Sequence, residues 1–122
     1  MSPGSGPDRR QEPRFSKHLS LQLFDENKQA LFDPIMLDLS MSGLCFETAK
    51  PPPIGSALSF RIHIPKHGFV AGVGTLRWAY EGKDAKFLCG IHFETFGWAN
   101  QQTLKSYLFP HASKRRPLED LD

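Results

Sequence analysis

The sequence contains little cysteine and no long apolar run, and each shortage excludes a class of protein. The two cysteines, Cys45 and Cys89, lie far apart without C-x-x-C spacing, so they indicate neither a disulfide framework nor a metal site. No apolar stretch approaches the roughly 20 residues that a membrane-spanning helix needs. The polar first residues lack the apolar core of a secretory signal peptide. We therefore expect reduced thiols, a cytoplasmic location and no membrane insertion.

Sequence motifs of catalysis are missing as well. The chain has no G-x-S-x-G nucleophile elbow and no phosphate-binding glycine loop followed by lysine. His63 and His67 have i, i+4 spacing, but Pro65 between them excludes a shared helical face, so we expect no metal role for them. A net charge of +2 is too mild for a general polyanion binder. We expect no catalytic residue, no metal, no cofactor, and no binding of DNA or RNA.

The chain is instead dominated by alternation of apolar and polar residues, which is typical of half-buried antiparallel strands. A further long strand pattern over residues 68–80 is interrupted by Gly72 and Gly74, which we interpret as bends or places of close backbone approach. We expect about six strands, closed or nearly closed into a barrel so that their edges are protected. The residues expected to face inward are Leu19, Leu21 and Leu23; Ile35, Leu37 and Leu39; Leu58, Phe60, Ile62 and Ile64; and Phe87, Cys89, Ile91 and Phe93.

The 122 residues suffice for one domain. Residues 1–9 are rich in Gly, Pro and Ser and are expected to form a flexible leader, with the folded domain over 10–109 and a disordered charged tail over 110–122. A helix is expected over 98–108, ended by Pro110. Its residues Leu104, Tyr107 and Leu108 share one face, which would pack on the sheet.

Two short motifs carry the chemistry. Arg10 and Arg14 form an R-x-x-x-R, and Asp38, Ser40 and Gly43 form a D-x-S-x-x-G. Arginine binds phosphate or the Hoogsteen edge of guanine through two N–H groups at once, whereas a carboxylate accepts hydrogen bonds from guanine N–H groups. Asp38 and Ser40 are two apart on an expected strand, so both should project away from the core, and the chain is expected to leave the sheet at Gly43. The set suits an anionic guanine nucleotide.

In these two motifs the sequence resembles the PilZ domains, bacterial receptors for cyclic di-GMP. The Gly-Thr-Leu-Arg-Trp stretch at 74–78 and the Gly-Ile-His-Phe stretch at 90–93 are similar to that family too. The resemblance implies a mainly all-β fold, a six-stranded antiparallel barrel with a C-terminal α-helix. It also implies that Arg10, Arg14, Asp38, Ser40 and Gly43 contact the ligand. Arg9, a basic residue just before the first motif, implies a stacked pair of ligand molecules, two per chain.

A receptor of this size is expected to signal through an unidentified downstream protein. Ligand would order the segment that carries the arginines and so create a surface that the partner recognises. One alternative is a PilZ-like adaptor that works without nucleotide, and another is a small barrel that binds single-stranded nucleic acid. The first is disfavoured because all the motif residues are present. The second is disfavoured because most Phe residues fall at inward strand positions.

The same residues could also have purely structural roles. Asp38 and Ser40 could simply form a turn before Gly43 by bonding to local backbone groups, and such a turn could also present a ligand-binding face. Trp78 is expected to pack on the sheet rather than contact ligand.

Overall fold

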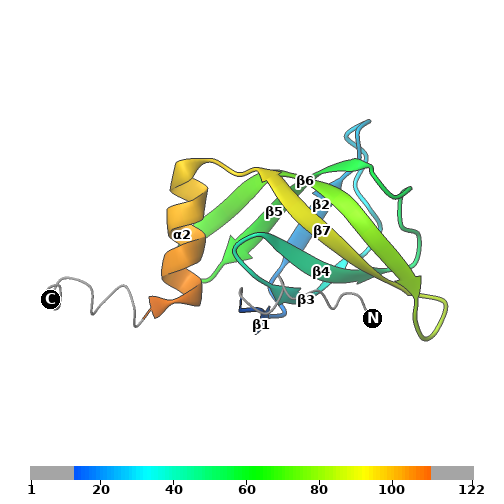
Figure 1. Ribbon diagram of the computed structural model, residues 1–122, viewed down its shortest axis with the longest axis horizontal. Coiled ribbons are helices and arrows are strands. Elements are labelled where there is room, and N and C mark those ends of the chain that lie inside the picture. The colour runs from blue at the N-terminus through cyan, green and yellow to red at the C-terminus, as the bar shows by residue number, and fades with distance from the viewer. Residues whose placement is uncertain (1–12, 111–122) are drawn as a thin grey trace, which may run out of the picture.

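The computed structural model describes residues 13–110, which form one antiparallel sheet and a helix (Figure 1). The expected leader over 1–9 and nearly all of the expected tail over 110–122 lie outside these residues. No helix within 13–110 is long and apolar enough to cross a membrane. The elements are β1 (Phe15–Ser16), β2 (Leu21–Phe24), β3 (Ile35–Leu39), β4 (Gly43–Thr48), β5 (Ala57–Ile64), β6 (Gly68–Glu81), β7 (Phe87–Thr95) and α2 (Trp98–Leu108).

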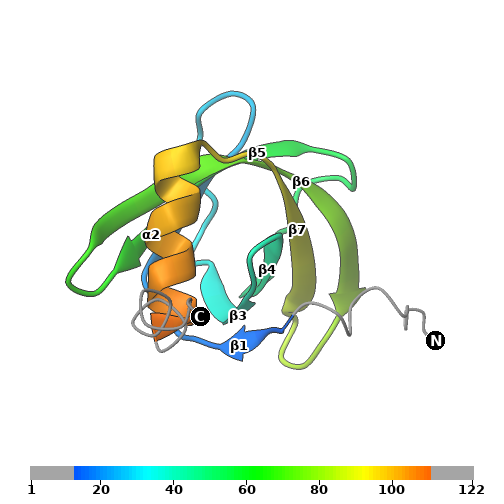
Figure 2. The same ribbon diagram turned by 60° about the vertical axis from the view of Figure 1, so that its left-hand side comes forward.

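The seven strands follow the order β1-β3-β4-β7-β6-β5-β2. The sheet curls into a barrel-like shape, with β5 and β6 on one side, β1 and β3 on the other, and α2 against it (Figure 2). The mainly all-β barrel with a C-terminal helix is therefore confirmed, with one strand more than the expected six. Alternation in the sequence did not predict two of the strands. One is β1, which has only two residues, and the other is β4, in which Leu44, Phe46 and Thr48 are buried.

The core is formed by the inward-facing residues of the strands and by one side of α2. Alternation predicted this well in β5, where Leu58, Phe60, Ile62 and Ile64 are all buried. At one end the rings of Phe60, Phe93 and Phe96 pack together, with centroids 4.5–5.7 Å apart. From α2, Leu104 and Leu108 are buried and Tyr107 packs beside them, as expected.

The prediction for β3 was partly wrong. Ile35, Leu37 and Leu39 were expected inward, but the buried residues are Met36 and Leu39, and Ile35 is 38% exposed. The pairing register with β4 shifts between Met36 and Asp38. Such an irregularity adds a residue to one strand and reverses which side chains face inward beyond it. Simple alternation cannot reproduce a strand that changes face halfway.

The glycines of β6 lie where neighbouring groups come very close. A Cβ at Gly72 would overlap the Thr95 carbonyl oxygen, and one at Gly74 would overlap the Ile91 side chain and the backbone of His92. The register with β7 also shifts between Val73 and Gly74. The expectation of close approach at these glycines is confirmed. They allow β6 to curve tightly over β7.

Replacing Gly74 by alanine should therefore destabilise the fold. Overpacking of a tight site costs about 1–3 kcal/mol, and the free energy of unfolding should fall by about that amount. Urea denaturation followed by circular dichroism measures it. Gly82→Ala is the matched control, because the nearest atom to its added Cβ, the Lys86 carbonyl oxygen, is at an ordinary 3.4 Å. Equal stability of both variants would contradict the packing argument.

Candidate functional site

The position of Arg14 is set by the short strand β1. Phe15 pairs with Leu39 and Ser16 with Asp38, so the residue just before β1 emerges beside the end of β3. The Phe15 ring meets Phe109, just after α2, edge to face with centroids 5.4 Å apart. The pairing with β3 and this ring contact together fix the position of the backbone from which the Arg14 side chain extends.

Arg14 and Asp38 form an ion pair at the surface. Arg14 Nε and Nη2 both donate to Asp38 Oδ1, at 2.9 and 2.7 Å. The two side chains are 37% and 30% exposed. Exposed ion pairs contribute only about 0–1 kcal/mol to stability. The main effect of the Arg14–Asp38 pair is therefore to hold a guanidinium and a carboxylate side by side, facing solvent.

Ser40 lies differently from the prediction. It was expected to project outward beside Asp38, but it is fully buried, because β3 ends at Leu39 and the chain turns. Its N–H donates to the Gly43 carbonyl at 2.9 Å, and its Oγ donates to the same oxygen at 3.2 Å. Ser42 N–H donates to Ser40 Oγ at 3.3 Å, while Arg14 Nη1 reaches that oxygen at 3.5 Å. The turn interpretation therefore holds for Ser40, which also borders Arg14.

Gly43 begins β4 rather than leaving the sheet, contrary to the prediction. It is buried and pairs with His92 of β7. A Cβ at this position would overlap the Ile91 carbonyl oxygen. Nearby, Phe93 N–H donates to the Ser42 carbonyl at 2.7 Å. The glycine thus lets the turn after Asp38 lie directly against β7.

The sheet register reveals a second part of the site that the motifs do not contain. Asp38 pairs with Cys45, Cys45 with Gly90, and Gly90 with Trp78, in one row across four strands. A Cβ at Gly90 would enter the Trp78 indole, so this ring lies over Gly90, and packing on the sheet is confirmed. Among residues 13–110, this row carries the Cys45 thiol between the ion pair and the indole, and the indole covers Gly90. We call Cys45 and Gly90 the site floor; only the strand register could have identified them.

The electrostatics of the floor are unusual. The pKa of the Cys45 thiol is raised to about 12, first by burial and then by the negative charge of Asp38, while Arg14 opposes the shift. The thiol is therefore neutral throughout the physiological pH range. The floor adds no charge to the site, and the ionic character comes from Arg14 and Asp38.

The remaining predicted contacts, Arg9 and Arg10, lie outside the described residues. Arg14, Asp38 and Ser40 are together. Over residues 13–110 no group of three or more His, Cys, Asp or Glu side chains is arranged to hold a metal ion.

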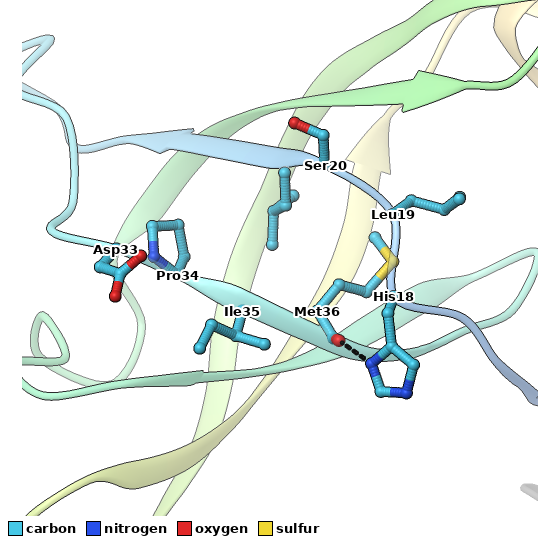
Figure 3. Close-up of a pocket in the computed structure, with 8 residues that line it drawn as sticks. His18, Leu19, Ser20, Asp33, Pro34, Ile35 and Met36 are labelled. Carbon is cyan, nitrogen blue, oxygen red and sulfur yellow. Dashed lines mark hydrogen bonds between the residues drawn. The ribbon is translucent and has the colours of Figure 1, made fainter.

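A separate cavity lies between the chain leading into β2 and the start of β3 (Figure 3). Its volume is about 410 Å³, and residues 18–21 and 33–36 line it. His18 Nδ1 lies 3.1 Å from the Met36 carbonyl oxygen. None of the described candidate contacts lines this cavity.

The geometry defines a small β-barrel with an exposed arginine–carboxylate pair beside an uncharged floor. The PilZ domain model matches residues 8–109, and the chain belongs to the PilZ domain family. No curated protein gave a significant match.

Solved structures share the fold. Inhibitor of motility (MotI/DgrA) from Bacillus subtilis is 20% identical with a TM-score of 0.72, and the match covers 95% of this chain and 58% of that one. The PilZ domain of YcgR from Escherichia coli, solved with c-di-GMP, is 19% identical with a TM-score of 0.67, covering 93% and 99%. MrkH of K. pneumoniae, in complex with c-di-GMP, is 15% identical with a TM-score of 0.68, covering 88% and 54%. The chain thus spans little more than half of two of these proteins.

The raised pKa of Cys45 has a measurable consequence. At pH 8 its alkylation by iodoacetamide should be on the order of 1000-fold slower than that of an unfolded thiol, since a rise of the pKa from 9.0 to about 12 lowers the thiolate fraction by that factor. Mass spectrometry of peptides distinguishes Cys45 from Cys89.

Asp38→Asn should lower the pKa of Cys45 and speed its alkylation, because the charge that opposes the thiolate is removed. Glu47→Gln, which alters another carboxylate close by in the sheet, is the control and should change nothing. Equal rates in the two variants would show that Asp38 does not act on this thiol.

Proposed function

We propose that this chain is a receptor for cyclic di-GMP that passes the level of this second messenger to a partner protein. The observation that carries the proposal is the Arg14–Asp38 pair, in which both family motifs meet at the surface. Membership of the PilZ family supports it, as do structural relatives that were solved with c-di-GMP. The proposed contacts are Arg9, Arg10, Arg14, Asp38, Ser40 and Gly43.

The chemistry of the pair fits the two kinds of group in this ligand. Arg14 can donate to a phosphate oxygen or to guanine O6 and N7. Asp38 can accept from guanine N1–H and the exocyclic amine. Its Oδ2 has no hydrogen-bond partner among residues 13–110, so it can accept a ligand hydrogen bond before the pair with Arg14 is broken. The guanidinium and the carboxylate are thus already close to their working positions.

The site floor adds no charge beside Asp38. Adjacent strands are about 4.8 Å apart, so the row from Asp38 to Gly90 spans about 10 Å, and the Trp78 indole covers its Gly90 end. Cys45 has a small side chain next to Asp38, and the indole over Gly90 bounds this stretch. Besides their proposed contact with the ligand, Ser40 and Gly43 hold the turn that presents Asp38, and Ser40 borders Arg14.

The proposed role is reception rather than catalysis. Within residues 13–110 the site pairs the Arg14 cation with the Asp38 anion beside a neutral thiol, a set suited to binding a ligand rather than to nucleophilic attack. Signalling would follow from ordering of the segment that carries Arg9 and Arg10 over a bound ligand, with two ligand molecules per chain. A nucleotide-independent adaptor remains the alternative function, and a binding experiment separates the two.

Isothermal titration calorimetry with cyclic di-GMP tests the proposal directly. Arg10→Ala and Arg14→Ala should each weaken binding about 5- to 150-fold, because a bidentate arginine–guanine contact is worth roughly 1–3 kcal/mol. Arg77→Ala is the control, since this exposed arginine pairs with Glu94 instead. No heat at tens of micromolar ligand would refute the receptor function. Unchanged affinity in both motif variants would place the ligand elsewhere.

Asp38 should determine which base is accepted. In Asp38→Ala the preference for cyclic di-GMP over cyclic di-AMP should shrink, because adenine has no N1–H that could donate a hydrogen bond to the carboxylate. Titration of both ligands into wild type and variant measures the preference. An unaltered ratio of the two dissociation constants would remove Asp38 from base recognition.

A further inference from the structure

A second surface lies on the hairpin formed by β5 and β6, away from the Arg14–Asp38 pair. Between Glu47 and Glu81 the chain has no acidic residue. The side chains that point outward from this hairpin include two apolar residues, Phe69 and Val73, which are 51% and 37% exposed. We define the β5–β6 outer face as Ser59, Arg61, His63, Phe69, Ala71 and Val73, with Lys66 and His67 in the adjoining turn.

Arg61 stacks on an aromatic ring of this face. Its guanidinium lies over the Phe69 ring, with Cζ 4.0 Å from the ring centroid. The His63 ring meets Phe69 from the side, at 5.2 Å between centroids. Stacking on an aromatic face leaves the N–H edge of a guanidinium available to a carboxylate. The arginine is therefore ordered before any anion binds.

No anion is supplied from within the described part of the chain. The ion pairs formed within residues 13–110 are Arg14–Asp38 and Arg77–Glu94, and neither involves Arg61. Across the sheet, Arg61 lies opposite Gln22 of β2 and Ala71 of β6, both uncharged. An ordered guanidinium surrounded by uncharged and basic neighbours is complementary to a carboxylate from another molecule.

The hairpin is accessible because it extends past its neighbours. Pairing of β6 with β7 begins at Val73, so residues 68–72 of β6 pair only with β5. Figure 2 shows this hairpin, in green, reaching out beside α2. The exposed backbone edge is partly covered, since Ala71 N–H donates to Asn100 Oδ1 at 3.1 Å. The side-chain face, rather than the strand edge, is therefore what the hairpin offers.

From these observations we propose that the β5–β6 outer face binds an acidic segment of a partner protein. A carboxylate of that segment pairs with the guanidinium of Arg61, and an adjacent apolar side chain covers Phe69 and Val73. This surface is distinct from the proposed nucleotide site and gives the chain a means of engaging a partner.

The magnitudes favour a protein segment over the other anionic partners. Nucleic-acid binding typically rests on about 6–10 phosphate contacts, whereas this face carries two permanent charges, Arg61 and Lys66. Attraction to an anionic membrane amounts to about 1 kcal/mol per basic residue, so two are insufficient. Phe69 also lies beneath a guanidinium rather than protruding for insertion. One ordered arginine flanked by apolar area suits one carboxylate flanked by an apolar side chain.

NMR titration of the ¹⁵N-labelled full chain tests the proposal. The probe is the blocked peptide acetyl-Gly-Asp-Phe-Glu-Leu-Gly-amide, and its control is the same peptide with Asn and Gln in place of Asp and Glu. The acidic peptide should shift the amide signals of residues 59–63 and 69–73, and the neutral one should not. Arg61→Gln should weaken binding about tenfold or more, because a hydrogen bond to a charged group is worth about 1.5–3 kcal/mol.

Two further variants make the result specific. Arg61→Lys should bind with intermediate affinity, because it keeps the charge but loses the planar pair of N–H groups. Arg77→Gln should bind like wild type. All variants should bind cyclic di-GMP like wild type, so failure of the peptide leaves the nucleotide proposal untouched, and the reverse also holds.

Several outcomes would overturn the proposal. Shifts spread evenly over the surface, or equal affinity in Arg61→Gln and wild type, would show non-specific attraction. Shifts of residues 59–73 with a short DNA duplex or with phosphatidylglycerol vesicles, but not with the peptide, would assign the face to those partners. Large shifts there on deletion of residues 117–122 would show that the acidic end of this chain occupies it instead.

Discussion

The site depends on the pairing of two residues of β1 with the end of β3. This pairing brings Arg14 next to Asp38, a residue 24 positions away in the sequence. So short a strand contributes little backbone hydrogen bonding, and it is held additionally by side chains at the end of α2. Phe15 packs on Phe109, and the Lys17 ammonium lies 5.0 Å from the Tyr107 ring centroid. The C-terminal helix therefore takes part in positioning the first motif.

Much of the fold and half of the described site could be predicted from the sequence. Alternation identifies strands whose faces stay constant, as in β5, and the two motifs pointed to Arg14 and Asp38, which the fold brings into contact. Alternation gave the wrong inward residues in β3, where a bulge reverses the faces. The expected positions of Ser40 and Gly43 were also wrong, because Ser40 belongs to a turn and Gly43 begins β4. The sequence could not predict the row formed by Cys45, Gly90 and Trp78, because strand register depends on pairing between distant segments.

The three arginines of residues 13–110 divide into two kinds of arrangement. Arg14 and Arg77 are each paired with a carboxylate across the sheet, whereas Arg61 stacks on an aromatic ring. When an anionic ligand binds to a paired arginine, it replaces the carboxylate partner, so the selectivity of that arginine rests on geometry. An arginine that stacks on a ring has no carboxylate to replace, so the ligand adds a new ion pair. The two surfaces would thus differ in their response to salt, since screening acts most on exposed, uncompensated charge.

The barrel is not joined by a continuous backbone ladder along its seam. β2 and the residues leading to β3 meet at Phe24 and Ala30, and Leu31 N–H donates to the Leu23 carbonyl at 2.9 Å. Beyond that point the two segments separate around the cavity of Figure 3, and β2 and β3 are not neighbours in the sheet order. Closure there rests on side chains such as Met36 and on the contact of His18. Fluctuations can therefore widen this side of the molecule without unzipping any strand pair, and solvent would reach the interior there before it reached the long ladders of β5, β6 and β7.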